Sequence, residues 1–168
     1  RCVIRNFSTK IDTFALMLTI YTNPKAKISG GLISGLLLDD GFIPLIDQSI
    51  DIAEKYKVKF LFTSGFRMNS DHLTGAVVTP AKMSNHFVGH AWDCNYYVDG
   101  KFYNNAFLID KGVPDLLKSA IEEIKGIGLR WGGDFKKVDL VHFDSNLNWK
   151  NPDLWHKKYL EYHASQVA

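Results

Sequence analysis

Cysteine and long apolar runs are both scarce in this chain of 168 residues. Two cysteines, Cys2 and Cys94, are too few for a disulfide framework, and neither belongs to a CxxC pair. The longest apolar stretch near the start, Phe14–Tyr21, is too short to cross a bilayer. We therefore expect no membrane span, and we expect Cys94 to be a buried structural thiol.

A strong excess of one charge is also missing. The net charge is +2 and 23% of the residues are charged, which is too little basic excess to indicate nucleic acid as a partner. The glycine cluster within Asn23–Gly35 lacks the Lys-Ser/Thr ending of a phosphate-binding loop, so we expect a flexible connection there. With no repeat or long linker, residues 1–168 are expected to form a single domain.

What the sequence does contain is a mixture of short strand and helix patterns. Apolar residues recur at helical spacing over residues 44–57, around Val113–Ile124 and after Asn151-Pro152-Asp153. Strands are expected at Val58–Phe66, Ala91–Val98, Lys101–Asn105 and Asp139–Phe143, with a hairpin turn at Asp99-Gly100. Because the helices are unevenly spaced, we predict an α+β fold, a small antiparallel sheet packed with helices.

Two short segments, Ser84–Asp93 and Trp131–Asp144, contain the residues most suited to chemistry. His86, Asp93 and His142 offer two imidazoles and one carboxylate, a donor set typical of catalytic zinc. A turn at Gly89 would let His86 and Asp93 converge. Asp139 is a candidate general base, but its odd spacing from His142 would place the two on opposite faces of a regular strand, so an irregular strand is required.

The other histidines are weaker candidates. His90, four residues after His86, could share a metal with it on a helix, although Gly89 makes a helix through this segment unfavourable. His72, His156 and His163 lie outside any ligand spacing and are expected to be solvated. Each of the three proposed ligands, taken alone, could equally be an ordinary core or surface residue.

Together these residues resemble a known family. Ser84-x-His86-x-x-Gly89-x-Ala91-x-Asp93 matches the SxHxxGxAxD signature of the zinc D-Ala-D-Ala carboxypeptidase/L-Ala-D-Glu endopeptidase family, and Asp139-x-x-His142 resembles its second signature. Thr63–Arg67 is similar to the strand end that carries the family's arginine. The block Trp131–Phe135 (WGGDF) is similar to the WGGDW segment of phage endolysins.

This resemblance implies a function and a division of roles. His86, Asp93 and His142 would bind Zn²⁺, and Asp139 would be the general base. Arg67 would steady the substrate and the developing oxyanion, while Ser84 would support the substrate or the ligand loop. The fold would be similar to Hedgehog domains and D-Ala-D-Ala peptidases. The partner would be a peptidoglycan stem peptide, met in the periplasm, outside the cell or at the bacterial wall.

The resemblance leaves alternatives open. The leading one is an L-alanyl-D-glutamate endopeptidase, the second a D-Ala-D-Ala carboxypeptidase or dipeptidase, and the third a non-catalytic binding module stabilised by zinc. The spacing from WGGDF to Asp139 is one residue short of the endolysin pattern, and Val141 stands where many members have proline. Residues 1–44 have no counterpart in the resemblance and could be an N-terminal extension.

Overall fold

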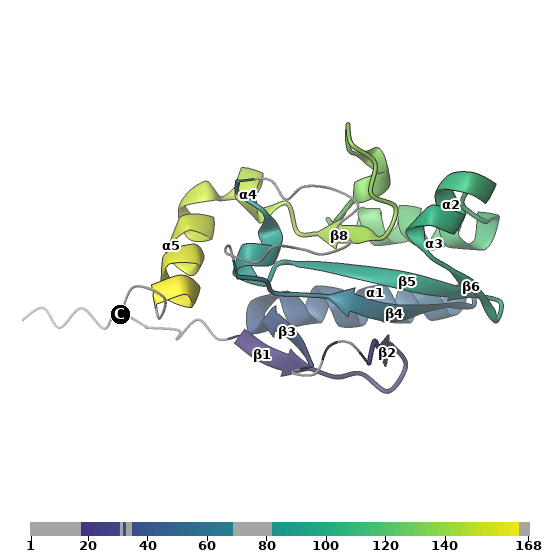
Figure 1. The fold of residues 1–168 in the computed structure, drawn as a ribbon, viewed down its shortest axis with the longest axis horizontal. Helices are drawn as coiled ribbons and strands as arrows, with labels where there is room; N and C mark the ends of the chain where they lie inside the picture. The colour runs from purple at the N-terminus through teal and green to yellow at the C-terminus, as the bar shows by residue number, and fades with distance from the viewer. Residues whose placement is uncertain (1–17, 31, 33–34, 69–81, 165–168) are drawn as a thin grey trace, which may run out of the picture.

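A six-stranded sheet with helices on one face forms the centre of the fold (Figure 1). The computed structural model describes residues 18–30, 32, 35–68 and 82–164. Within these ranges no helix combines the length and the apolarity needed to cross a bilayer. The strands are β1 (Leu18–Tyr21), β2 (Lys27–Ile28), β3 (Leu36–Asp39), β4 (Val58–Ser64), β5 (Ala91–Val98), β6 (Lys101–Tyr103), β7 (Arg130–Trp131) and β8 (His142–Asp144). The α-helices are α1 (Ile43–Lys55), α2 (Asn105–Lys111), α3 (Asp115–Gly126), α4 (Leu147–Lys150) and α5 (Pro152–His163).

The main sheet has the order β2-β4-β5-β8-β7, with β6 paired to β5. The pairings are antiparallel except for the short parallel ladder between β2 and β4. A separate two-stranded sheet joins β1 and β3. The predicted α+β class is therefore confirmed, with one parallel pair that the sequence did not indicate.

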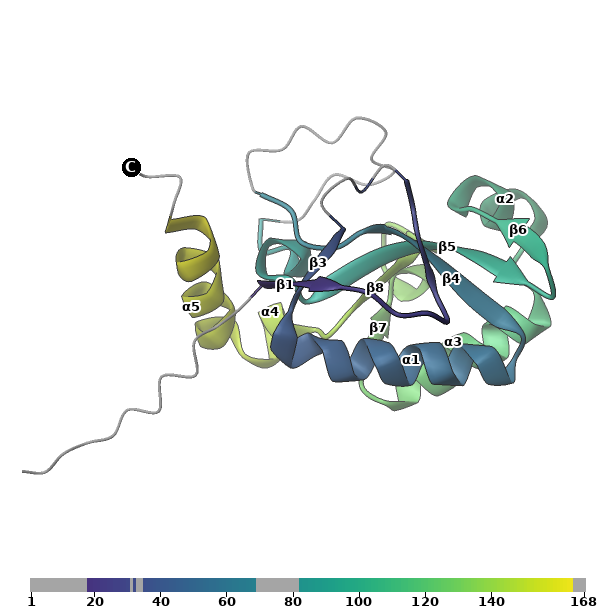
Figure 2. The same cartoon turned by 90° about the horizontal axis from the view of Figure 1, so that it is seen from below.

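Alternation along β5 separates the two faces of the sheet. Trp92, Cys94 and Tyr96 are fully buried in the core that α1 and α3 cover, as Figure 2 shows from below. The buried Cys94 confirms the expected structural thiol. Since successive side chains of a strand point to opposite faces, Asp93 is directed to the face that these two helices leave uncovered.

Most predicted elements are present, with shifted ends. The helix expected at 44–57 is α1, the strand Val58–Phe66 ends at Ser64, and Ala91–Val98 is confirmed as β5. The strand Lys101–Asn105 ends at Tyr103, because Asn104 caps the N-terminus of α2, a helix that the apolar pattern did not reveal.

Two further expectations need correction. The strand predicted at Asp139–Phe143 begins only at His142, after a turn at residues 140–141. The Asn23–Gly35 segment contains the short strand β2, so in its described part it is not a loop throughout. Residues 1–17 lie outside the described part of the chain.

Helix α5 is attached to the rest of the fold by a buried polar cluster. Asp39, at the end of β3, is fully buried and accepts hydrogen bonds from Lys158 and Tyr162 of α5. His90 Nε2 lies 3.3 Å from the other oxygen of Asp39. Burial alone would raise the pKa of Asp39, but the neighbouring His90 and the hydrogen bonds from Lys158 and Tyr162 lower it to about 2. Asp39 is therefore ionised and paired at neutral pH.

One prediction about the histidines is wrong, and it concerns His163 on α5. His163 is buried, and its Nε2 lies 2.9 Å from the carbonyl oxygen of Phe87, so the expectation of a solvated His163 is wrong. The 3.6-residue period places His163 on the same face as Trp155 and Tyr159, and it stacks on Tyr159. His156 is exposed, as expected, and His72 lies outside the described residues.

Replacing Lys158 by methionine should destabilise the protein strongly. The substitution keeps an unbranched side chain as far as Cε but leaves the Asp39 carboxylate buried without the Lys158 cation. Breaking a buried pair in this way costs about 3–5 kcal/mol. Urea unfolding of Lys158→Met and of the exposed neighbour Lys157→Met measures this effect. An equal free energy of unfolding for the two variants would contradict the assignment.

Candidate metal centre

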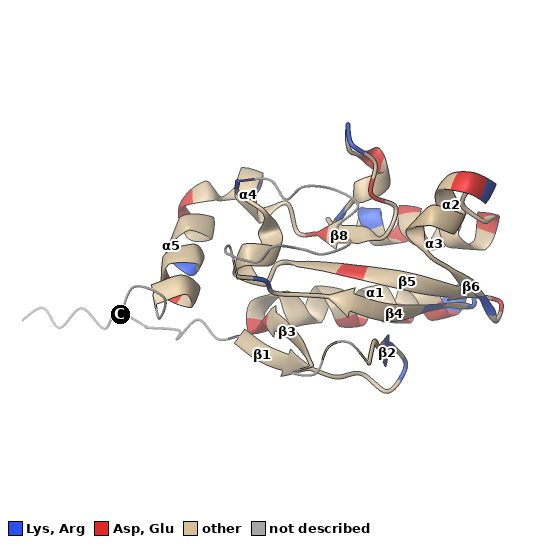
Figure 3. Ribbon diagram, in the orientation of Figure 1, with Lys and Arg blue, Asp and Glu red and all other residues tan. Residues whose placement is uncertain are grey.

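The register of the sheet brings two of the predicted ligands together. Asp93 of β5 and His142 of β8 are directly opposite each other in an antiparallel pair. His142 Nδ1 lies 3.0 Å from Asp93 Oδ1. His86 joins them from a neighbouring 3₁₀ turn, with Nε2 3.2 Å from Asp93 Oδ1 and 3.2 Å from His142 Nδ1. Figure 3 shows a red acidic band on β5, and the sequence of this strand contains one acidic residue.

The turn that carries His86 depends on Ser84 and Gly89. The turn spans Asn85–Val88, and the Ser84 hydroxyl accepts a hydrogen bond from the His86 N–H at 3.4 Å. Gly89 ends it with a φ of 69°, and a Cβ at this position would lie 2.5 Å from the backbone nitrogen of Asp39. Glycine is therefore required here for both conformation and space. The expected reversal at Gly89, followed by a strand from Ala91, is confirmed.

Each imidazole is held by a partner on its outer side. His86 Nδ1 lies 2.6 Å from the carbonyl oxygen of Gly65, which can only accept, so Nδ1 carries the proton and Nε2 is left with its lone pair. His142 Nε2 lies 3.0 Å from Asp144 Oδ2, so this outer nitrogen can keep a proton when a cation takes the place of the proton between Nδ1 and Asp93. The two rings thus direct His86 Nε2 and His142 Nδ1 at one point next to Asp93.

The separations of these atoms fit a zinc ion. Bonds of about 2.0–2.1 Å at tetrahedral angles place neighbouring ligand atoms about 3.3 Å apart, and the three observed distances are 3.2, 3.2 and 3.0 Å. His86, Asp93 and His142 also form a possible metal-holding group by proximity alone. Two imidazoles, one carboxylate and partners on the outer side of both rings make a donor set that zinc favours.

The pKa values of the cluster show how its buried charges balance one another. Burial alone would raise the pKa of Asp93, but His86 and His142 hold it well below its usual range. Burial alone would lower the pKa of His142, but hydrogen bonds to Asp144 and Asp93 raise it to about 9. A proton on His142 therefore compensates the carboxylates, a role that a bound cation can take over.

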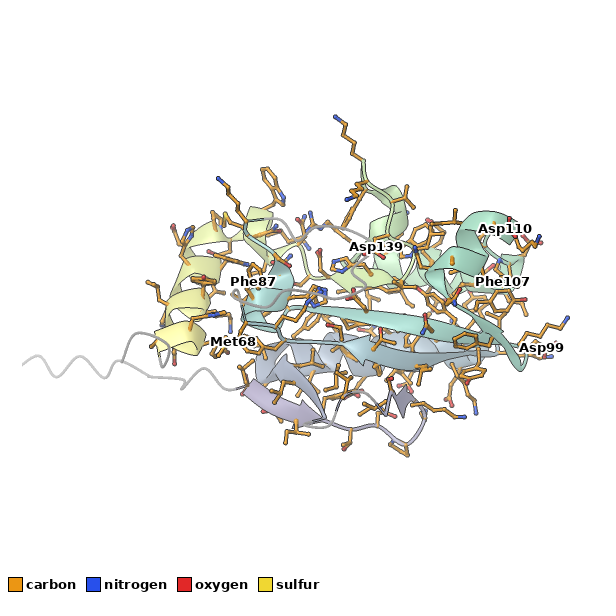
Figure 4. The ribbon with its side chains drawn as sticks, in the orientation of Figure 1. Met68, Phe87, Asp99, Phe107, Asp110 and Asp139 are labelled. Carbon is orange, nitrogen blue, oxygen red and sulfur yellow. The ribbon has the colours of Figure 1, made fainter. Side chains whose placement is uncertain are left out.

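Asp139 lies in the segment that leads into β8, as labelled in Figure 4. The backbone turns between Asp139 and His142, whose N–H donates to the Asp139 carbonyl at 3.2 Å. This turn is the irregularity that the odd spacing required. Burial, followed by the nearby charge of Asp93, raises the pKa of Asp139. A partly buried carboxyl with a raised pKa is suited to accepting and releasing a proton.

The WGGDF block supports this turn. The Asp139 N–H donates to the Gly132 carbonyl at 2.9 Å, and Trp131 Nε1 donates to the Leu140 carbonyl at 3.1 Å. A Cβ on Gly132 would lie 2.3 Å from the Asp139 carbonyl oxygen, and one on Gly133 would lie 2.1 Å from the Trp131 ring. The two glycines therefore allow the block to pack directly under the Asp139 segment.

Val141 marks a departure from the resembled pattern, in which many members have proline. Its N–H points to Asp139 Oδ1 at 3.5 Å, a long contact that a proline, with no N–H, could not make. Val141 also accepts a hydrogen bond from the Cys94 N–H at 2.9 Å, which joins the turn to β5.

Replacing Gly132 by alanine should displace Asp139 without unfolding the protein. The added Cβ would meet a backbone oxygen at 2.3 Å, so the turn must move. We expect weaker zinc binding and a lower kcat. The matched control is Gly126→Ala at the end of α3, where a Cβ meets nothing within 4 Å. If Gly132→Ala binds zinc and turns over substrate like the control, the supporting role of WGGDF is wrong.

Arg67 and His90 have different relations to the centre. Arg67 Nη2 lies 3.4 Å from Asp93 Oδ2, and its backbone N–H donates to the His86 carbonyl at 3.1 Å. The structure thus brings Arg67 to the ligand cluster. His90 instead points away from it, with Nδ1 3.1 Å from the Ser145 hydroxyl and its ring stacked on Phe42. Among the described residues, His90 does not belong to the metal-holding group.

All six predicted site residues are in the described part of the chain, and each of them contacts another of the six or shares the turn into β8. The contact of Ser84 is with the backbone of His86, and a contact with substrate stays a prediction. The sequence did not indicate Asp144, which contacts His142, or Arg130, which pairs with Asp144. Asp144 could have been found, since a residue two positions after His142 shares its face of the strand.

Comparison with known proteins supports the family resemblance. Residues 78–145 match the family model described as D-alanyl-D-alanine carboxypeptidase. This segment contains Ser84, the three candidate ligands and Asp139, whereas Arg67 precedes it. The resemblance to this family is therefore confirmed for the part of the chain that builds most of the site.

The chain was also compared with curated proteins and with solved structures. No curated protein matches the chain in sequence. Among solved structures, the L-Ala D-Glu endopeptidase ChiX of Serratia marcescens is similar, with 23% identity, a TM-score of 0.38, and coverage of 62% of this chain and 80% of that chain.

Proposed function

We propose that this protein is a zinc-dependent peptidase of peptidoglycan stem peptides, because residues 78–145, which contain most of the site, match the family model described as D-alanyl-D-alanine carboxypeptidase. The observation that carries the proposal is the convergence of His86, Asp93 and His142 within 3.2 Å of one another, with Asp139 on the adjoining turn. A peptidase of this class would work at the bacterial wall, in the periplasm or outside the cell.

His86 Nε2, Asp93 Oδ1 and His142 Nδ1 would hold the ion. Zinc bound there would supply a Lewis acid and lower the pKa of a water molecule from about 16 to about 7. Three protein ligands leave one position open, which is the arrangement of catalytic rather than structural zinc.

Asp139 would act as the proton carrier. Its carboxylate takes the proton from the attacking water and then passes it to the nitrogen of the departing amine. Its raised pKa favours this exchange, because a carboxyl with a higher pKa is a stronger base. The hydrogen bonds of the WGGDF block would hold Asp139 in place during both steps.

Arg67 and Ser84 would contribute to binding and stabilisation. The Arg67 guanidinium, which lies against Asp93, is a cation that can stabilise negative charge growing on the substrate carbonyl oxygen. Ser84 would support the His86 turn, and its hydroxyl could also contact the peptide.

Within this chemistry we propose an L-alanyl-D-glutamate endopeptidase, which the similarity of WGGDF to endolysin segments favours. The alternative is a D-Ala-D-Ala carboxypeptidase or dipeptidase, the activity that the matched family's description states. A carboxypeptidase needs a cation for the terminal carboxylate of its substrate, and Arg67 is one such cation at the cluster.

A defined stem pentapeptide tests both assignments. With zinc-loaded protein, mass spectrometry should show release of the N-terminal alanine if the protein is the endopeptidase. Release of a C-terminal D-alanine would instead identify the carboxypeptidase. Stoichiometric zinc with neither product would contradict peptidase function and favour the zinc-stabilised binding module.

A further inference from the structure

We propose that Asp144, fixed by Arg130, is a positioning residue that sets the orientation and tautomer of His142 for metal binding. This inference rests on the proposed function only in taking His142 as a zinc ligand. It concerns residues outside the ligand set and outside the reacting groups, and it follows from the register of three adjacent strands.

The register of the sheet makes His142, Asp144 and Arg130 neighbours on one face. His142 and Asp144 are two residues apart on β8, so they share the uncovered face of the sheet. Arg130 of β7 is directly opposite Asp144 in the antiparallel pair. On the other side of β8, Asp93 is directly opposite His142. Cross-strand neighbours thus connect the metal cluster with Arg130.

The Asp144 carboxylate has every acceptor position occupied. Arg130 donates through Nε to Oδ1 and through Nη2 to Oδ2, both at 2.8 Å. The Asn146 N–H donates to Oδ1 at 2.7 Å, and His142 Nε2 lies 3.0 Å from Oδ2. A carboxylate offers about four acceptor sites. Because Asp144 is 2% exposed and uses all four, it is held rigidly and can only accept from His142.

Hydrogen bonds of Arg130 also extend to the segment that carries His86, the other candidate histidine ligand. Arg130 Nη2 donates to Asn148 Oδ1 at 3.2 Å, and Asn85 Nδ2 donates to the same oxygen at 3.1 Å. The Asn148 N–H in turn donates to Asn85 Oδ1 at 3.1 Å. Asn85 directly precedes His86 in the chain. One polar network therefore fixes the two histidine-bearing segments relative to each other.

An outer partner of this kind acts on a metal ligand in two ways. It keeps the proton on Nε2, so that Nδ1 is the donor atom, and it increases the electron density that the ring offers to the metal. Loss of such a partner weakens metal affinity by about 10–100-fold. Asp144 is thus expected to influence zinc affinity without contacting zinc or substrate.

Zinc affinity of Asp144→Asn, measured by competition with a chelator and without any substrate, tests the proposal. We expect zinc binding about 10–100-fold weaker than in the wild type, and loss of the protected His142 Nε2–H signal in NMR spectra of the zinc-loaded protein. The matched control is Asp110→Asn, an exposed carboxylate of α2 paired with Lys111 on the surface. A folded Asp144→Asn protein with wild-type zinc affinity would overturn the proposal.

A second variant keeps the test decisive if Asp144→Asn does not fold. Arg130→Lys retains the positive charge but loses the two parallel hydrogen bonds to Asp144. A smaller loss of zinc affinity is expected, whereas lower thermal stability with unchanged zinc affinity would show a purely structural role and overturn the proposal. Failure of the wild type to cleave stem peptides would count against the proposed function alone, since these measurements use no substrate.

Discussion

Asp139→Asn should bind zinc like the wild type and lose most of its peptidase activity. The substitution preserves shape but removes the carboxylate that takes and returns the proton. General acid–base catalysis contributes about 10²–10⁴-fold to a rate, and we expect kcat to fall within that range with little change in KM. Zinc content of the purified variant and kcat on a stem peptide are the two measurements.

The pH dependence adds a second readout for the same variant. Because the base must be ionised, wild-type activity should fall as the pH drops through the pKa of Asp139, which burial raises. The variant should lack this acidic limb. Asp134→Asn, in the same WGGDF block but half-exposed and paired with Lys125, is the matched control. Wild-type kcat in a zinc-loaded Asp139→Asn protein would contradict the assigned role.

Asp93→Asn should abolish tight zinc binding. Asp93 supplies the only negative charge among the three candidate ligands, and one of its oxygens lies within 3.2 Å of both histidine donor atoms. An amide oxygen at the same place carries no charge. We therefore expect a loss of zinc affinity larger than the about 10–100-fold caused by changing an outer partner, and loss of activity with it. Chelator competition measures the affinity.

The control for this variant is Asp99→Asn, at the other end of β5. Asp99 lies in the exposed turn of the hairpin, far from the centre, as Figure 4 shows. The Asp99→Asn variant should retain wild-type zinc affinity and activity. Equal zinc affinity in Asp93→Asn and Asp99→Asn would exclude Asp93 as a ligand.

The convergence of the three candidate ligands was predictable in part because their spacing reflects local backbone geometry. A glycine between His86 and Asp93 indicated the reversal, and the structure gives Gly89 a φ of 69°. The strand Ala91–Val98, which carries Asp93, was also predicted correctly. These signals depend on neighbours in sequence, so periodicity and turn chemistry are sufficient to reveal them.

The structural features that the sequence did not reveal depend mostly on contacts between segments that are distant in the chain. The turn at residues 140–141 is held by Gly132 and Trp131, and no local pattern around Asp139 reports those partners. The burial of His163 likewise results from Phe87 and Tyr159. Helix α2 was missed because its seven residues are too few for a clear apolar period.

A structure of the zinc-loaded protein tests the central claim most directly. We predict zinc bound by His86 Nε2, Asp93 Oδ1 and His142 Nδ1, with the Asp139 carboxylate within hydrogen-bond reach, about 2.6–3.2 Å, of the group in the open position. Zinc bound elsewhere, or bound by these three residues with Asp139 directed away from the open position, would contradict the account.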